Sequence, residues 1–129
     1  MILPLESNKR PIVKASINNK EVYMLVDTGA SVGVIDLNAL DKLDVKRGYE
    51  LEYELVGLGS NNKAYHTKRC IVDANGVKLF QFITMDISNI VESIKHETNI
   101  TISGIIGTPQ IKSSEMKIDL DNGIIKIGY

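Results

Sequence analysis

The segment LVDTGASVGVI, residues 25–35, contains the residue with the clearest chemical potential in the chain. Asp27 follows an apolar run directly, precedes Thr28 and Gly29, and is then followed by a second apolar run. A carboxylate is costly to bury between apolar strands unless it has a partner. Two carboxylates that share one proton form such a pair, because one can take a proton from water while the other donates to a carbonyl oxygen. This pattern favours acid–base chemistry at Asp27.

A second segment, SGIIGTPQ at residues 103–110, has a similar pattern. Each segment is an apolar strand that ends in a turn containing glycine, MLVDTGAS early in the chain and SGIIGTPQ late. Glycine at such positions permits sharp turns and close approach of two backbones. The two segments therefore predict two similar strand–turn units that meet near one centre.

Short β-segments separated by turns rich in Asn and Gly dominate the rest of the chain. Such turns tolerate the positive φ that tight hairpins require, so they predict hairpins where they join two β-favouring segments. Four hairpins are predicted: 12–17 with 21–27, 51–59 with 63–73, 69–73 with 77–85, and 115–120 with 124–129. Four hairpins in one small chain predict an all-β sandwich or barrel.

Three segments have helical features. Residues 36–43 place leucines on one side, with Asp36 as a candidate N-cap. Residues 87–94 have isoleucine and valine at helical spacing, and the helix is expected to start near Asp86 or Ser88. Residues 108–114 predict a helix with Thr108 as N-cap and Pro109 at the first helical position.

Length and composition set the broad class. The chain has 129 residues, and residues 1–129 are expected to form one domain with a single core. The formal net charge of -1 gives no electrostatic case for a nucleic-acid partner. No apolar run approaches the roughly 18 residues that cross a bilayer, and the start shows no secretory signal pattern. We therefore expect no nucleic-acid or membrane partner.

Cysteine and histidine give no sign of a metal centre. Cys70 is the only cysteine, which excludes an internal disulfide and a multi-cysteine metal site. Its place in an alternating segment predicts a small, buried or half-buried residue. His66 and His96 have no partner at ligand spacing, so neither metal nor cofactor is expected. A reducing, cytoplasmic setting is the expected localisation.

The two glycine-containing segments carry a resemblance to a known family. VDTGAS resembles the active-site signature of aspartic proteases, and GIIG resembles their second motif of two apolar residues and a glycine. One copy of each in a short chain is similar to the retropepsin-like branch, the retroviral and related bacterial proteases. The resemblance covers about residues 11–127 and leaves residues 86–99 without a clear counterpart. It implies an all-β, retropepsin-like acid-protease fold: a closed or partly closed barrel with psi-type loops and one to three short helices.

The resemblance also implies a homodimeric aspartic endopeptidase that acts on polypeptides. The chain has no second D-T-G or D-S-G, and Asp73, Asp86, Asp119 and Asp121 lie in other contexts. Asp27 would therefore meet Asp27 of a second copy across a two-fold axis. The ionised member of the pair would activate a water and the protonated member would polarise the scissile carbonyl, without metal or cofactor.

Each neighbour of Asp27 receives a role from the resemblance. The Gly29 N–H would approach the carboxylates, and the Thr28 hydroxyl would form a hydrogen bond across the dimer. Gly29, Ala30 and Ser31 would line the substrate groove. In the second motif, Ile105 and Ile106 would pack behind the catalytic turn, and Gly107 would allow the close chain approach.

Residues 57–62, GLGSNN, resemble the flap that closes over a bound peptide. Gly57, Leu58, Gly59 and Ser60 would contact the substrate, whose extended chain could add as a strand. The chain also departs from the family pattern in three places. Thr108-Pro109 follows Gly107, the flap tip has no aromatic residue, and serine stands at position 31, where retroviral members often have an acid.

Two other interpretations remain open from the sequence. The chain could be a catalytically inactive retropepsin-fold module that dimerises and binds peptides, with Asp27 retained for structure. It could also be a β-rich domain in which D-T-G is only turn chemistry. Activity separates the first alternative from the enzyme, because both share one fold.

Overall fold

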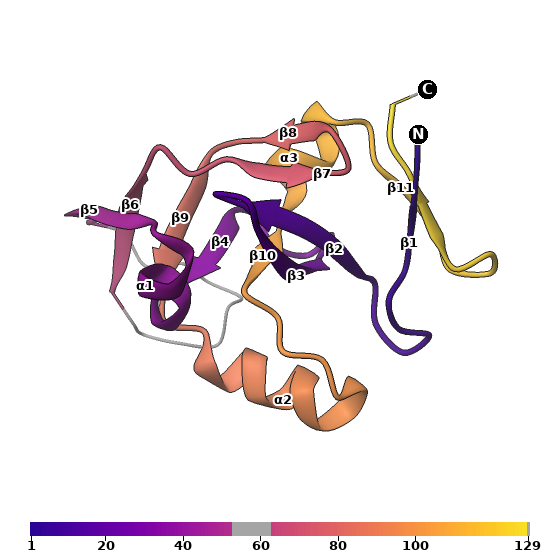
Figure 1. The fold of residues 1–129 in the computed structure, drawn as a ribbon, viewed down its shortest axis with the longest axis horizontal. Coiled ribbons are helices and arrows are strands. Elements are labelled where there is room, and N and C mark those ends of the chain that lie inside the picture. The colour runs from indigo at the N-terminus through magenta and orange to yellow at the C-terminus, as the bar shows by residue number, and fades with distance from the viewer. Residues whose placement is uncertain (53–62, 129) are drawn as a thin grey trace.

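The computed structural model describes residues 1–52 and 63–128, and within them the chain is mostly β-structure (Figure 1). The helices are short: α1 (Leu40–Leu43), preceded by the 3₁₀ turn η1 (Leu37–Ala39), α2 (Ser88–Thr98) and α3 (Thr108–Ser113). The strands are β1 (Ile2–Pro4), β2 (Ile12–Ile17), β3 (Lys20–Val26), β4 (Gly33–Asp36), β5 (Lys46–Glu50), β6 (Ala64–Lys68), β7 (Val72–Ala74), β8 (Val77–Leu79), β9 (Phe82–Met85), β10 (Gly104–Ile106), β11 (Lys117–Asp119) and β12 (Ile124–Lys126). The predicted all-β class with a few short helices is confirmed. In the described part of the chain, no helix has the length and apolar character needed to cross a membrane.

The strands form two sheets. The larger has nine strands in the order β5-β6-β9-β4-β10-β3-β2-β7-β8, and the smaller has three in the order β1-β12-β11. Among the described residues neither sheet closes on itself, so the expected barrel holds only as a loose description of the curved nine-stranded sheet. In Figure 1 the three-stranded sheet, which brings the two termini together, lies to one side of the larger sheet.

The centre of the large sheet is the arrangement β3-β10-β4. Strand β10 runs parallel to β3 and antiparallel to β4, so it lies between the two strands that precede and follow the D-T-G turn. Neighbouring residues of these strands point to opposite faces of the sheet, and both faces are buried. This explains why MLV, GVI and GII are continuous apolar runs rather than alternating ones.

Each face of the sheet carries its own core. The first core includes residues from β2, β3, β4 and β10 together with α1, the β7–β8 hairpin and the three-stranded sheet. Its fully or almost fully buried members include Val13, Val26, Ile35, Ile106 and Ile125. The second core lies on the opposite face and comprises Ile12, Leu25, Ala30, Val34, Ala64, Met85, Ile87, Ile94, Ile102 and Ile105. Helix α2 therefore packs on the second face through Ile94, together with Ile87, the residue just before its start.

Two predicted hairpins have the turns that their residues favour. Asn18 and Asn19 both have positive φ, 51° and 65°, between the antiparallel strands β2 and β3. Asn75 and Gly76, with φ of 53° and 94°, join β7 to β8 in the same way. The fourth predicted hairpin is also confirmed, with β11 pairing β12 across the turn that contains Gly123.

Three predicted strand segments differ from the structure. The predicted strand 63–73 is wrong as a single element, because it divides into β6 and β7 around Arg69, whose φ is 48°. The predicted strand 77–85 is wrong as a single element, because it divides into β8 and β9, and β9 instead pairs in parallel with β4. The division occurs at Gln81, whose φ is 68°. The predicted arm 51–59 lies almost wholly outside the described residues, and the strand that pairs with β6 there is β5, at Lys46–Glu50.

The helix starts follow the prediction in part. Asp36 caps η1 as expected, because its Oδ1 accepts from the Asn38 N–H at 3.2 Å. Helix α2 begins at Ser88, whose N–H donates to Asp86 Oδ1, and extends to Thr98, four residues beyond the prediction. Thr108 as N-cap is wrong, because the N-cap of α3 is Gly107 and Thr108 is its first helical residue.

The thiol of Cys70 gives a test of this core. Cys70 is buried in the first core, and burial raises the pKa of its thiol to about 11. We expect it to react with a disulfide reagent at pH 8 at least about a hundredfold more slowly in the native protein than in urea, since only an exposed thiolate reacts fast. Equal rates in the two conditions would show that the first core is not packed as described.

Candidate active site

Asp27 lies where β3 leaves the sheet. Its N–H still belongs to the ladder, because it donates to the carbonyl oxygen of Ile106 at 2.9 Å. Its side chain is half-buried, and its Oδ1 accepts from the Gly29 N–H at 2.8 Å, which is the approach expected of Gly29. A hydrogen bond from the Ala30 N–H to the Asp27 carbonyl oxygen, 3.2 Å, closes the turn. These bonds fix the Asp27 carboxylate at the end of β3, one of the three strands at the centre of the large sheet.

The second motif packs behind this turn. Ile105 and Ile106 are fully buried on opposite faces of the sheet, where Ile105 pairs with Leu25 and Ile106 pairs with Val26. A Cβ on Gly107 would overlap the carbonyl of Val32 and lie 3.0 Å from the Ala30 oxygen. Only glycine fits between those backbones, so the close chain approach expected at Gly107 is confirmed.

Thr108 connects the two motifs directly. Its N–H donates to the carbonyl oxygen of Ala30 at 2.9 Å. Its hydroxyl donates to the carbonyl oxygens of Ala30, 3.0 Å, and Thr28, 3.2 Å. Thr108 therefore supplies hydrogen bonds to the turn that follows Asp27, a role that its expected place as a helix cap did not suggest.

Gln110 holds the second motif in place through hydrogen bonds, a role that the sequence did not predict. It is only 1% exposed, and both ends of its amide are hydrogen-bonded. Its Oε1 accepts from the Gly107 N–H at 3.0 Å, and its Nε2 donates to the carbonyl oxygens of Phe80, 2.8 Å, and Gln81, 3.2 Å. Because burial of an unpaired amide is costly, this full set of partners holds Gly107 and the β8–β9 connection in one geometry.

The other predicted site residues fall into three groups. Thr28 and Ser31 are exposed beside the turn, where the groove was expected. Ala30 is 5% exposed and packs in the second core, and its N–H and carbonyl oxygen are already bonded to Asp27 and Thr108. Gly57, Leu58, Gly59 and Ser60, the predicted flap contacts, lie outside the described residues.

Four other aspartates accept hydrogen bonds in turns or at helix starts. Asp73 accepts from the Gly76 N–H, and Asp119 accepts from the backbone and side chain of Asn122. Asp86 accepts from the Ser88 N–H, which holds the pKa of the Asp86 carboxyl below its usual range. Asp36 caps η1. Each of these carboxylates is thus accounted for by its own turn or helix start.

Arg10 and Glu97 form a charged pair at the C-terminal end of α2. Arg10 binds Glu97, in the last turn of α2, through Nε to Oε1 at 2.9 Å and Nη2 to Oε2 at 3.0 Å. The hydrogen bond and charge of Glu97 raise the pKa of Arg10, and the charge of Asp27 raises it further. Neither Arg10 nor Glu97 was identified from the sequence.

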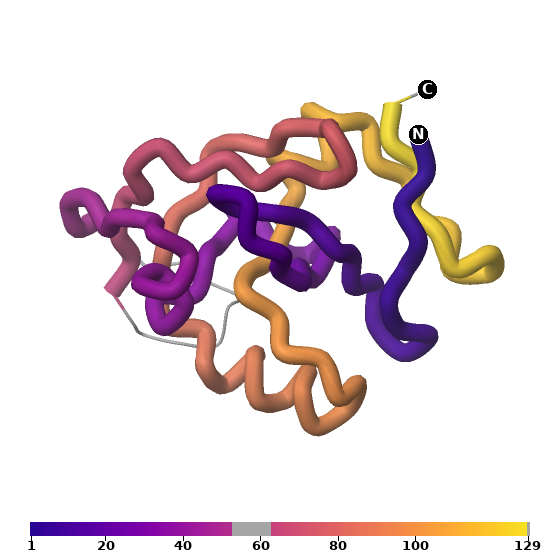
Figure 2. Tube along the Cα trace, in the orientation of Figure 1, coloured from indigo at the N-terminus to yellow at the C-terminus, as the bar shows by residue number. Residues whose placement is uncertain are grey.

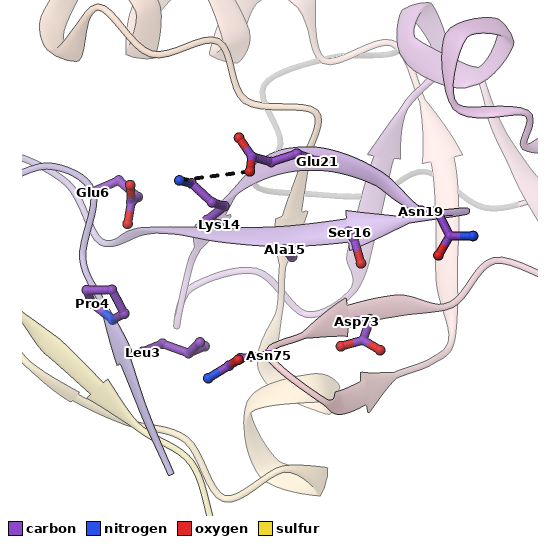
Figure 3. A pocket seen from close by; sticks show the side chains of 10 residues that line it. All are labelled: Leu3, Pro4, Glu6, Lys14, Ala15, Ser16, Asn19, Glu21, Asp73 and Asn75. Carbon is purple, nitrogen blue, oxygen red and sulfur yellow. Dashed lines mark ion pairs between the residues drawn. The ribbon is translucent and has the colours of Figure 1, made fainter.

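The hollow shown in Figure 3 lies elsewhere on the protomer. It encloses about 490 Å³ between β1, β2 and the β7–β8 turn, and Lys14 and Glu21 form an ion pair beside it. None of the predicted site residues lines it.

The sequence and the fold were compared with known proteins. A family model described as "gag-polyprotein putative aspartyl protease" matches residues 13–113, a range that contains both motifs. A search of curated protein sequences found no match.

Three solved structures have a similar fold. The protease of EIAV, complexed with the inhibitor HBY-793, is 19% identical, with a TM-score of 0.56 over 85% of this chain and 92% of that one. The retroviral protease-like domain of Ddi1 from Leishmania major is 22% identical, with a TM-score of 0.58 over 90% and 86%. A retropepsin-like aspartic protease from Rickettsia conorii is 17% identical, with a TM-score of 0.58 over 100% and 90%.

The packing at Gly107 can be tested by substitution. Gly107→Ala places a methyl group against backbone atoms that cannot rotate away, so we expect the free energy of unfolding to fall by about 3 kcal/mol. Gly76→Ala is the control, because no atom lies within 4 Å of its Cβ position and only its positive φ opposes alanine, which costs about 1–2 kcal/mol. Urea denaturation measures both. A Gly107→Ala variant as stable as the control would contradict the close approach.

Proposed function

Because the chain belongs to the gag-polyprotein aspartyl protease family and has a retropepsin-like fold, we propose that it is an aspartic endopeptidase that works as a homodimer. The observation that carries this proposal is the D-T-G turn. This turn presents the half-buried Asp27 carboxylate at the end of β3. The second motif packs against the turn, and Ile106 accepts a hydrogen bond from the Asp27 N–H.

The proposal of a dimer rests on the number of aspartates that one protomer places at the D-T-G turn. A protomer supplies Asp27, while Asp73, Asp86 and Asp119 accept hydrogen bonds in their own turns or helix starts. A two-fold axis beside Asp27 brings two copies of that residue together in an isologous contact. The exposed position of Thr28 at the same turn supports its role as a hydroxyl that bonds across the dimer.

The three-stranded sheet provides a surface for that contact. Its edge strands are β1 and β11, and an edge strand can pair with a second chain through its free backbone groups. Two large apolar side chains face solvent in the protomer, Ile2 in β1 at 55% exposure and Leu120 in the turn after β11 at 68%. Burial of such side chains would favour association.

The chemistry needs only the paired carboxylates and a water. The ionised Asp27 takes a proton from the water, which attacks the scissile carbonyl carbon, while the protonated partner donates to the carbonyl oxygen. The Gly29 N–H stabilises the charged carboxylate by its hydrogen bond to Oδ1. Collapse of the tetrahedral intermediate transfers a proton to the leaving amine and breaks the C–N bond.

Substrate contacts are proposed on both sides of the carboxylates. Gly29, Ala30 and Ser31 line the floor of the groove, with serine giving a neutral hydrogen-bonding side chain at position 31. Gly57, Leu58, Gly59 and Ser60 contact the substrate from above. An extended polypeptide fits such a groove because its backbone can pair as an added strand.

Replacement of the carboxylate tests the enzyme. Asp27→Asn keeps the size of the side chain but cannot carry the negative charge, so we expect loss of peptide cleavage by at least about a thousandfold. Thermal unfolding and sedimentation should remain close to wild type. Cleavage that survives in this variant would rule out the aspartic mechanism.

An inhibitor with a statine-like hydroxyl separates the enzyme from the two alternatives. Such a hydroxyl mimics the tetrahedral intermediate, so it should bind between the two carboxylates and raise the melting temperature of the dimer. A raised melting temperature without any cleavage by the wild type would favour the inactive binding module. No shift and no cleavage would favour a β-rich domain with an ordinary D-T-G turn.

A further inference from the structure

We propose that Thr108 is a positioning residue for the Asp27 carboxylate, and that its hydroxyl acts on the acid through the peptide group between Thr28 and Gly29. This inference rests on the proposed function, because it gives one more side chain a part in the same site. It also assigns a role to the threonine that follows Gly107, where the chain departs from the family pattern.

A chain of hydrogen bonds connects the Thr108 hydroxyl to the Asp27 carboxylate. Thr108 Oγ1 donates to the carbonyl oxygen of Thr28 at 3.2 Å. The same peptide group contains the N–H of Gly29, which donates to Asp27 Oδ1 at 2.8 Å. Because the C=O and N–H of one peptide group are conjugated, a donor at the oxygen makes the N–H a stronger donor in turn. One peptide group therefore transmits the effect of the hydroxyl to the acid.

The Thr28 carbonyl depends on the Thr108 hydroxyl more than the second acceptor does. The hydroxyl also lies 3.0 Å from the carbonyl oxygen of Ala30, but that oxygen accepts from the Thr108 N–H at 2.9 Å as well. Within residues 1–52 and 63–128, Thr108 Oγ1 is the one donor to the Thr28 carbonyl oxygen. Removal of the hydroxyl therefore leaves Ala30 with a protein donor and Thr28 without one.

The second motif holds the Thr108 side chain in place independently of the bonds that its hydroxyl forms. Strand β10, which leads into Gly107, runs beside β3, which leads into Asp27 (Figures 1 and 2). Gly107 packs against the backbone of Val32, and Thr108 begins helix α3 directly after it. Valine has nearly the shape of threonine, so Thr108→Val removes the donor and keeps the β-branched side chain.

Asp27 needs this support because its carboxylate has to face both its symmetry mate and the attacking water. In the described part of the chain, the Gly29 N–H is the one group that donates to this carboxylate. A weaker bond from Gly29 lets the Asp27 side chain rotate, and a small loss of alignment at a reacting group slows the chemical step. Substrate binding along the groove uses other groups, so kcat should fall while KM stays nearly unchanged.

The first test measures hydrogen exchange of the Gly29 amide by NMR and does not depend on cleavage. In Thr108→Val the Gly29 N–H should exchange about fivefold faster than in wild type, because its bond to Asp27 is weaker. Thr108→Ser keeps a hydroxyl and should restore the wild-type rate. The Asp27 N–H, which donates to Ile106, is the internal control and should not change.

The second test measures peptide cleavage. We expect Thr108→Val to lower kcat about tenfold with KM within about twofold of wild type, and Thr108→Ser to retain most of the activity. Thr98→Val is the matched control and should keep wild-type kcat, because the Thr98 hydroxyl also donates to a backbone carbonyl, that of Ile94 in α2, at 2.7 Å. Thr108→Ala and Thr108→Ser form a second pair, with small side chains, that answers the same question if the valine variant does not fold.

Three results would overturn the inference. They are a Gly29 exchange rate in Thr108→Val equal to that of wild type, a Thr108→Ser variant that loses as much activity as Thr108→Val, or a rise in KM that accounts for the whole loss. Failure of the proposed function looks different, because then wild-type protein cleaves no peptide while the Gly29 exchange rate still separates Thr108→Val from Thr108→Ser.

Discussion

The position of Asp27 depends on one backbone contact, the insertion of β10 between β3 and β4. Asp27 donates its N–H to Ile106, and Thr108, one residue past the second motif, donates to Ala30 on the far side of the same turn. The two motifs, which are almost eighty residues apart, are thus joined on both sides of the carboxylate. Gly107 makes this possible, because a Cβ would not fit against Val32. An alanine there would have to separate the chains that hold the acid.

Polar groups buried around this contact make the arrangement specific. Gln110 satisfies the Gly107 N–H and two carbonyls of the β8–β9 connection, and loss of any one partner leaves a buried group that costs about 1–3 kcal/mol. The same connection contains Gln81 in a left-handed conformation, which a glutamine seldom adopts without such support. The bonds from Gln110 thus connect the site to a strand break that lies far from it in sequence.

Local patterns in the sequence predicted most helices and strands. The features that these patterns did not predict depend on contacts between residues far apart in the chain. Asn18-Asn19 and Asn75-Gly76 have the residues that tight hairpins require, so their turns could be predicted. The break at Gln81 could not, because no turn residue marks it and its partner, Gln110, is distant. Thr108 seemed a helix cap because its hydroxyl could serve locally, but that hydroxyl bonds to the Asp27 turn. Arg10 and Glu97 are 87 positions apart, and no motif signals their contact.

The central claim is that one functional site needs a carboxylate from each of two chains. It is tested most directly by mixing wild-type protein with a ninefold excess of the Asp27→Asn variant, letting subunits exchange, and measuring peptide cleavage per wild-type chain. If the site is shared, only about one tenth of wild-type chains find a wild-type partner, and activity should fall to about one tenth. Activity that stays proportional to the amount of wild-type protein would show that a single chain suffices, and would contradict the account.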